Sequence, residues 1–490
     1  MDINKISQKL TFDDVLLVPQ YSQILPKSTS TSTFFSKRIA LKVPLVSAAM
    51  DTVTENEMAI EMALAGGIGV IHKNLSPKKQ AKEVAKVKRF ENGFIFSPEV
   101  LSPHEKIEKA FKIRQKLGFK AIPITEDGQA NGKLVGLLTA NDFFIDRHKE
   151  VKIAKRMTVV KNLLTAEKGI SLEEAREILE ESKHSKLLIV DKKGSLFAMV
   201  TRRDIEKQRN FPKATLDNKE RLITAAAVGI NDLKERSKEL ASVEVDAFVL
   251  DTAHGHSKKV IDSIKFLKKN FPQIDVVAGN VATEKGAEDL IAAGVDSVKV
   301  GIGPGSICTT RIISGIGIPQ LSAILDCSKI TRQKNIPLIA DGGIKFSGDV
   351  AKALAAGASS VMLGSLLAGT KESPGELIFS NGKTFKIYRG MGSLSAMKKG
   401  SADRYNQNYS KNLDKLVPEG IEGQTIYKGS VKNEIFQIIG GLKASLGYQG
   451  CKNIKELHKK AKFVRITNAS LKESHPHDIF ITKHSPNYRK

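Results

Sequence analysis

The sequence predicts an α/β protein whose main domain is a (β/α)8 TIM barrel with a smaller module inserted into it. Three observations favour this fold. Short apolar segments recur at the spacing of βα units, polar residues gather just after these segments, and the rhythm breaks once, between about residues 92 and 215. Continuous apolar strands are typical of parallel sheets buried on both faces. Eight such segments favour a closed barrel over an open doubly wound sheet, although an open sheet also binds its ligand at strand ends.

Each predicted strand is a run of apolar and β-branched residues that ends in Gly, Asp, Asn or Ser. The eight runs are residues 44–50, 66–72, 221–229, 247–255, 275–283, 297–305, 337–343 and 360–369. The stretches between them, such as 284–294 and 348–357, have helical spacing and end in glycine, which is a helix stop signal. A barrel carries its chemistry just past the strand ends. The polar residues at these places are Asp51, Asp251, Asn280, Cys308, Asp341 and Ser365.

The segment that interrupts the rhythm contains an internal duplication. Residues 120–144 and 185–207 each predict a strand, a polar turn with glycine, a second strand, and then Thr-x-x-Asp at the start of a helix. The duplication indicates a pair of modules, although a purely structural repeat is an alternative. The expected barrel comprises residues 1–91 and 216–490. The inserted module is expected at 92–215, with its two copies at about 92–150 and 155–215. Within the second part of the barrel, about 380–430 is expected to form a mobile flap or lid.

Composition narrows the class of protein further. The chain has 490 residues, 41% of them hydrophobic, which is enough for a large core. No apolar run approaches the ~18 residues of a membrane helix, and the start lacks the order of a signal peptide. Three cysteines form neither a disulfide framework nor a zinc motif, so we expect a cytoplasmic protein. The net charge of +24 is spread along the chain, which favours a solvated basic surface and small anionic ligands over nucleic acid.

The most informative motif is GIGPGSICTTR at residues 301–311. Glycines after a strand let successive backbone N–H groups turn inward and bind an anion. The motif is no Walker loop, because no Gly-Lys-Ser/Thr follows, and its spacing differs from the dinucleotide fingerprint. Cys308 on this loop is a candidate nucleophile. Cys327 lies on a periodic helical stretch and is interpreted as a core residue, and no function is inferred for Cys451.

Two further motifs, ADGG at 340–343 and LGS at 363–365, end the seventh and eighth strands. Barrels commonly hold a phosphate there with backbone N–H groups. The Asp341 carboxylate suits sugar hydroxyls rather than the phosphate itself. Tight turns without a ligand are the alternative. Together with Cys308, these motifs predict a sugar-phosphate ligand whose reacting atom lies near the thiol.

These residues carry a resemblance to a known family. The segments 47–55, 251–257, 301–311, 340–344, 388–393 and 417–423 resemble bacterial IMP dehydrogenases, in the order of that family. The resemblance covers essentially the whole chain, including the insert, which resembles a tandem CBS (Bateman) module. It implies a TIM barrel that oxidises inosine 5′-monophosphate (IMP) to xanthosine 5′-monophosphate (XMP) with NAD, a step of guanine nucleotide synthesis.

The resemblance also assigns roles to residues. It implies that Cys308 adds to C2 of hypoxanthine, that hydride leaves for NAD, and that water then hydrolyses the thioimidate with the help of Thr310 and the lid residues Arg404 and Tyr405. Arginine is an awkward base, because its pKa is ordinarily above 12. The implied IMP-binding residues are Ser306, Asp341, Gly343, Gly364, Ser365, Tyr388, Gly390, Met391, Gly392 and Glu419. The implied NAD-binding residues are Asp251, Asn280, Gly301 and Gly303.

Members of this family also bind potassium and form homo-oligomers. The resemblance implies a K⁺ site at the carbonyls of Gly303, Gly305 and Cys308, completed by Glu473, Ser474 and His475 of a neighbouring subunit. It therefore implies a homotetramer, or an octamer with purine-nucleotide effectors on the CBS module. Arg202, Arg203 and Asp204 form the expected effector site. The first copy carries Asn141 where the family has arginine, so we expect altered purine-nucleotide regulation.

Three other functions stay open at this point. GMP reductase shares the barrel and the cysteine loop but deaminates GMP reductively with NADPH, and it normally lacks the CBS pair and the Arg-Tyr lid. A nonenzymatic nucleotide sensor would use the CBS module alone. A nucleic-acid binder would use the positive charge, and its affinity would fall steeply with salt.

Overall fold

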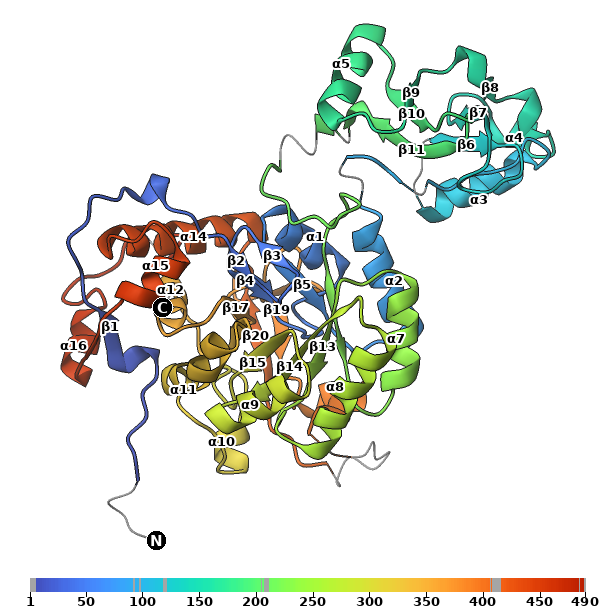
Figure 1. Cartoon of the computed structure of the whole chain (residues 1–490). Coiled ribbons are helices and arrows are strands. Elements are labelled where there is room, and N and C mark those ends of the chain that lie inside the picture. Colours follow the sequence, from blue (N-terminus) through green and yellow to red (C-terminus); the bar gives the residue numbers. More distant parts are fainter. Residues whose placement is uncertain are drawn as a thin grey trace. The chain divides into compact units, whose positions relative to one another are not determined.

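The computed structural model describes residues 6–90, 93–96, 98–117, 121–203, 205–206, 211–405, 407, 416–483 and 485–488 (Figure 1). The chain divides into two compact units. The barrel unit comprises Met1–Arg89, Lys213–Thr215 and Leu222–Lys490, and the inserted unit comprises Phe90–Pro212 and Leu216–Arg221. Among the described helices, none combines the length and the apolar character needed to cross a lipid bilayer.

The barrel unit is built on eight parallel strands that close into a ring, in the order β12-β13-β14-β15-β16-β17-β4-β5. The strands are β4 (Leu45–Ser47), β5 (Ile68–Ile71), β12 (Ala225–Val228), β13 (Ala247–Asp251), β14 (Asp275–Val281), β15 (Ser297–Val300), β16 (Leu338–Asp341) and β17 (Ser360–Leu363). Each of the eight predicted segments contains one of them, which confirms the barrel. Side chains two positions apart, such as Ala247 and Val249, are buried together in the barrel interior.

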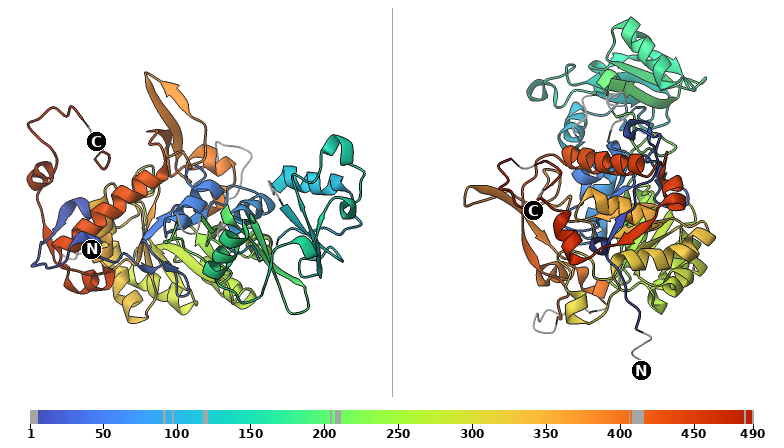
Figure 2. Two further views of the ribbon diagram at one scale, coloured as in Figure 1. Left: turned by 90° about the horizontal axis from the view of Figure 1, so that it is seen from above. Right: turned by 90° about the vertical axis from the view of Figure 1, so that its left-hand side faces the viewer.

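Helices cover the outside of the strands (Figure 2). They are α1 (Asn56–Leu64), α2 (Pro77–Lys88), α7 (Leu233–Ser242), α8 (Lys258–Asn270), α9 (Glu284–Ala292), α11 (Gln320–Gln333), α12 (Ser347–Ala355) and α14 (Val431–Tyr448). Local signals set their ends. The Thr283 side chain caps α9 by accepting from the Gly286 N–H. Gly294 and Gly357 follow α9 and α12 with positive φ, as the predicted glycine stops require.

Shorter elements complete the barrel unit. Strands β1 (Val15–Leu17) and β21 (Phe463–Arg465) pair with each other, as do β2 (Thr33–Phe34) and β3 (Ala40–Leu41). The helical pieces are η2 (Phe12–Asp14), η3 (Pro26–Ser28), α10 (Thr310–Ile313), α15 (Ile454–Lys460) and α16 (Asn468–Glu473).

The predicted flap is more regular than a loop. Strands β18 (Ile378–Ser380), β19 (Lys383–Arg389) and β20 (Glu422–Ile426) form an antiparallel sheet, and its β18–β19 hairpin extends away from the barrel in Figure 2. Between β19 and β20 lie α13 (Leu394–Lys398) and the 3-10 helix η6 (Ser401–Tyr405). The turn of the hairpin is Asn381-Gly382, both with positive φ, which is the two-residue turn that matches strand twist. This Asn-Gly signal was available in the sequence.

Each half of the inserted unit contains a helix followed by an antiparallel hairpin. The first copy holds α3 (Ile107–Leu117), β6 (Ala121–Thr125), β7 (Leu134–Thr139), α4 (Ile145–His148), η4 (Ile153–Lys155), β8 (Thr158–Val159) and η5 (Val160–Asn162), and the second holds β9 (Thr165–Glu167), α5 (Leu172–Ser182), β10 (Lys186–Val190) and β11 (Leu196–Thr201). The hairpins β6–β7 and β10–β11 both shift register just before their turns, at Ile124/Thr125 and Ile189/Val190. The shared irregularity supports the internal duplication.

The helix start predicted at Thr139 is wrong. The Asp142 carboxylate accepts from the Thr139 N–H at 2.5 Å, but the chain forms a turn there and α4 begins only at Ile145, after Phe144. This contact is half of a capping box, but here it closes a turn that does not continue into a helix. The matching Asp204 lies outside the described residues.

Candidate active site

Two adjoining cavities, of about 120 and 230 Å³, open among the C-terminal ends of the barrel strands. They share Pro304, Gly305, Asp341 and Tyr388 among their lining residues. The smaller cavity, here called the cysteine cavity, is lined by residues expected to contact the purine ring or to act in catalysis. They are Cys308, Gly390, Met391, Arg404, Tyr405 and Glu419. The residues expected at the phosphate line the larger one, here called the phosphate cavity: Ser306, Gly343, Gly364 and Ser365.

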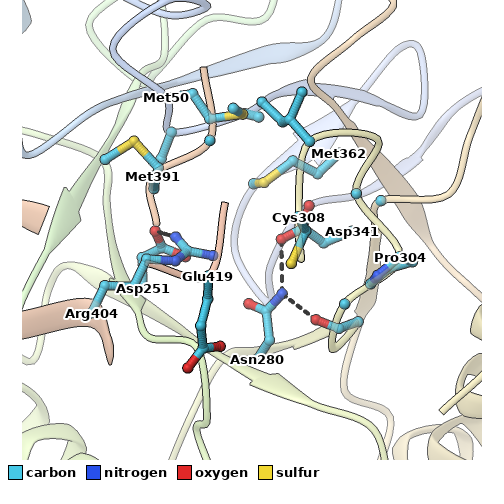
Figure 3. A pocket seen from close by; sticks show the side chains of 18 of the residues that line it. Met50, Asp251, Asn280, Pro304, Cys308, Asp341, Met362, Met391, Arg404 and Glu419 are labelled. Atoms are coloured by element: carbon cyan, nitrogen blue, oxygen red, sulfur yellow. Dashed lines mark hydrogen bonds and ion pairs between the residues drawn. The ribbon is translucent and has the colours of Figure 1, made fainter. Parts of the chain in front are cut away.

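The cysteine loop follows β15 and passes tightly over the end of β16. A Cβ at Gly301 would overlap the Asp341 carbonyl oxygen, and φ at Gly301 and Gly303 is positive, so the loop requires glycine there. Cys308 is partly exposed and faces the cysteine cavity (Figure 3). Its thiol lies 3.2 Å from the hydroxyl of Thr310, which is buried at the start of α10. Thiol and hydroxyl therefore form a hydrogen-bonded pair.

A buried charge network forms the wall opposite the loop. The Lys299 ammonium, on β15, donates to Asp251 and Asp341 at 2.8 Å each and also to the Asn280 side chain. Asn280 in turn donates to Asp341 at 2.9 Å and to the Gly301 carbonyl at 2.7 Å (Figure 3). Lys299 is 1% exposed. One cation thus orients the two carboxylates that were expected to bind sugar hydroxyls.

Arg404 and Tyr405 come to this cavity from η6. The Arg404 guanidinium donates to Asp251, and the Arg404 carbonyl accepts from the Ala253 N–H at 2.9 Å. Among the described residues, the Arg404 Nε is buried without a hydrogen-bond partner. Burial raises the pKa of Tyr405, which keeps its hydroxyl protonated. A Cβ at Gly392 would lie 2.8 Å from the Tyr405 hydroxyl, so glycine leaves room for the ring.

The phosphate cavity offers glycine backbone and hydroxyls. Gly343 has positive φ, and a Cβ at Gly364 would lie 3.0 Å from the Tyr388 hydroxyl. Burial raises the pKa of Tyr388 to about 12, so its hydroxyl stays a hydrogen-bond donor. Exposed N–H groups and neutral hydroxyls suit a phosphate.

Comparison with known proteins agrees with this geometry. Residues 9–477 match the IMP dehydrogenase / GMP reductase domain family. The chain belongs to this family. Curated relatives named inosine-5′-monophosphate dehydrogenase include one from Aquifex aeolicus, 51% identical over 99% of this chain and 98% of that protein. Another, from Staphylococcus aureus, is 52% identical over 98% of both.

A solved structure matches as well. It is a variant of GMP reductase from Trypanosoma brucei in complex with guanosine 5′-monophosphate, with a TM-score of 0.87 and 38% identity, and the match covers 97% of this chain and 99% of that one. That reductase therefore matches the inserted unit too. The insert by itself does not separate the two activities of the IMP dehydrogenase / GMP reductase family, contrary to our expectation.

The expected effector residues, and the tail residues expected to complete the cation site, lie outside both cavities. Arg202 donates to carbonyls at the end of α5, those of Leu179 and Glu180, so its guanidinium is engaged by a helix terminus. Arg203 is exposed, and Asp204 lies outside the described residues. Glu473, Ser474 and His475 line neither cavity. The His475 ring contacts the Tyr488 hydroxyl at 2.9 Å.

Sequence reasoning missed three ionisable residues of the site. Lys299 interrupts the apolar run of β15, and a lysine inside a buried strand was a signal that could have been used. Lys73 forms an ion pair with Asp403, a residue of η6. No local pattern connects these two, because they are 330 residues apart.

Proposed function

We propose that this member of the family is an IMP dehydrogenase, which oxidises IMP to XMP with NAD in guanine nucleotide synthesis. The observation that carries the proposal is that η6 brings Arg404 and Tyr405 into the same cavity as Cys308. A reductase needs no group that activates water beside its cysteine, whereas a dehydrogenase of this kind does. The relatives at 51% and 52% identity that carry the dehydrogenase name support the same choice.

The proposed reaction has two halves. The Cys308 sulfur bonds to C2 of the hypoxanthine, and the C2–H bond breaks with its electron pair. NAD, when bound, accepts that hydride. The thiol proton is released in this first half. Water then adds its oxygen to C2 of the thioimidate, the C–S bond breaks, and the two protons of the water pass to N3 of the ring and to the sulfur, which returns the thiol. The balance is IMP, NAD⁺ and water giving XMP, NADH and one proton.

Asp251 links the two halves. Its carboxylate is 2% exposed and accepts from both Lys299 and Arg404. We propose that the Arg404 guanidinium occupies the place of a cofactor ribose at Asp251, so that NAD and η6 take turns at this carboxylate. Asn280, Gly301 and Gly303 line the same cavity and remain the proposed NAD contacts. The contact of Arg404 with Asp251 supports the proposed role of Arg404 and Tyr405 in the hydrolytic half.

Further parts of the proposal concern ions and assembly. K⁺ would bind the carbonyls of Gly303, Gly305 and Cys308, which suit a hard cation, together with residues 473–475 of a neighbouring subunit. Such a shared site would need an oligomer, for which we propose a homotetramer, or an octamer when nucleotides occupy the inserted unit. The paired hairpins of that unit support a tandem CBS module, and exposed Arg203 is its proposed effector contact. The three free cysteines support a cytoplasmic location.

The test compares two assays on the purified protein. IMP with NAD should produce NADH absorbance, and GMP with NADPH should give no loss of NADPH. Intact mass after mixing with IMP and NAD should show a nucleotide adduct that Cys308→Ala abolishes and Cys451→Ala retains. Consumption of NADPH with GMP, without NADH formation from IMP, would replace the proposal by a reductase.

A further inference from the structure

A buried ion pair joins the barrel to η6 outside both cavities. Lys73 follows β5, and its ammonium donates to the Asp403 carboxylate, with the two side chains 4% and 9% exposed. Neither residue lines the cysteine cavity or the phosphate cavity. Burial lowers the pKa of Lys73, and the Asp403 charge opposes this shift. The pair therefore lies where water does not weaken it.

The surroundings are shaped for this pair. A Cβ at Gly229, just past β12, would overlap the Asp403 carboxylate and lie 2.7 Å from the Lys73 ammonium. The neighbouring Asn74 donates to the Ala396 carbonyl of α13 at 3.3 Å. The loop after β5 thus holds the segment of α13 and η6 at two points.

Asp403 and Arg404 are consecutive residues of η6, so an interaction that fixes the position of Asp403 also restricts the position of Arg404. Arg404 reaches Asp251 with its guanidinium and Ala253 with its carbonyl. Without Lys73, the buried Asp403 carboxylate would lose the cation that pairs with it. Its free energy would then be lower in water than in the buried position. Such a movement would pull η6 out of the cysteine cavity.

We infer that Lys73 is a positioning residue for the hydrolytic half of the reaction: through Asp403 it holds Arg404 and Tyr405 in the cysteine cavity. This inference rests on the proposed function. Lys73 acts only by holding η6 in the cysteine cavity. Hydride transfer needs η6 withdrawn from that cavity, so this half of the reaction should not depend on Lys73.

The first test separates the two halves kinetically. In Lys73→Met, the burst of NADH should keep its rate within about twofold, while steady-state turnover falls by about tenfold or more, because a misplaced group costs only the step that uses it. The Cys308 adduct should accumulate in intact mass. Lys73→Arg, which retains the charge, should recover part of the turnover.

The control is a second buried lysine–aspartate pair in the same barrel. Lys88, at the end of α2, contacts Asp246 at 2.9 Å, with side chains 3% and 13% exposed. Lys88→Met should lower the melting temperature without a selective loss of hydrolysis. The double variant Lys73→Met with Asp403→Leu removes both charges and guards against misfolding, and it should show the same selective loss. Equal slowing of both halves would overturn the inference.

The second test needs no activity. Hydrogen exchange at the Ala253 amide, which donates to Arg404, reports whether η6 is in place. Lys73→Met should accelerate this exchange by about tenfold or more, and Lys88→Met should not. Unchanged exchange would overturn the inference even in an active enzyme. If the unaltered protein makes no NADH from IMP, the proposed function fails, and exchange still decides whether Lys73 positions Arg404.

Discussion

The three cysteines differ in environment, and this difference decides which of them can react. Cys327 is buried on α11, and burial raises its pKa to about 12. Burial also raises the pKa of Cys451. Cys308 alone among them is partly exposed, at the mouth of a cavity. Only its thiol combines access with a polar partner, Thr310.

We therefore predict selective alkylation. Iodoacetamide in mildly alkaline buffer should label Cys308 first, and IMP should protect it, because the nucleotide would cover the thiol. Peptide mapping by mass spectrometry checks both statements. Labelling of Cys327 at a similar rate, or labelling of Cys308 that IMP does not slow, would contradict the assignment.

Lys299 contacts two carboxylates, that of the buried Asp251, which also accepts from Arg404, and that of the partly exposed Asp341. Replacing Lys299 by methionine leaves Asp251 and Asp341 without that charge, and removing one partner of a buried pair costs about 3–5 kcal/mol. Lys299→Met should therefore lower the melting temperature and weaken IMP binding in calorimetric titration. The matched control is Lys285→Met, which removes a lysine from an exposed pair on α9 and should leave both quantities unchanged. A stable Lys299→Met protein with normal IMP affinity would show that the network does not orient the site.

At the scale of elements, the cysteine loop depends on close backbone contact. Gly301→Ala would place a methyl group against the Asp341 carbonyl in a backbone conformation with φ of +148°. The loop or the end of β16 must then move, so IMP affinity and NADH formation should fall by about tenfold or more. The control Gly348→Ala, in α12, meets nothing within 4 Å and should retain full activity. Calorimetry and the NADH assay measure the two effects. Normal IMP affinity in Gly301→Ala would mean that the cysteine loop accommodates a side chain at this position.

The elements also show what local sequence can predict. The strands of the barrel were predictable because parallel strands buried on both faces, such as β13 and β14, are buried along their whole length and mostly apolar. The absence of a helix at Thr139 was not, because a Thr-x-x-Asp contact can close an isolated turn as well as open a helix, and both give the same local sequence pattern. The sheet of the flap was not predicted, because its strands are too polar to show an apolar pattern, although Asn381-Gly382 marks its turn.

At the scale of the whole molecule, the site joins residues that lie far apart in the sequence. Arg404 and Asp251 are 153 residues apart, and Lys73 and Asp403 are 330 apart. Periodicity places each residue on an element, but only the closure of the barrel brings the elements together. The motifs therefore indicated the cavity residues, while the ion pairs that orient them required the structure.

The two units also differ in what they contribute. The ring of barrel strands closes without the inserted unit, and the Thr215 N–H, just after the segment Phe90–Pro212, donates to the Ala63 carbonyl in the barrel. Replacing residues 90–212 by a short Gly-Ser linker should therefore leave a folded barrel that forms NADH at a rate within about threefold of the full chain. Responses to added purine nucleotides should disappear with the excised unit. Calorimetry, the NADH assay and nucleotide titration measure these outcomes, and the same excision with Cys308→Ala serves as the inactive control. A variant that folds but loses NADH formation would show that the inserted unit is part of the catalytic machinery, not a regulatory attachment to it.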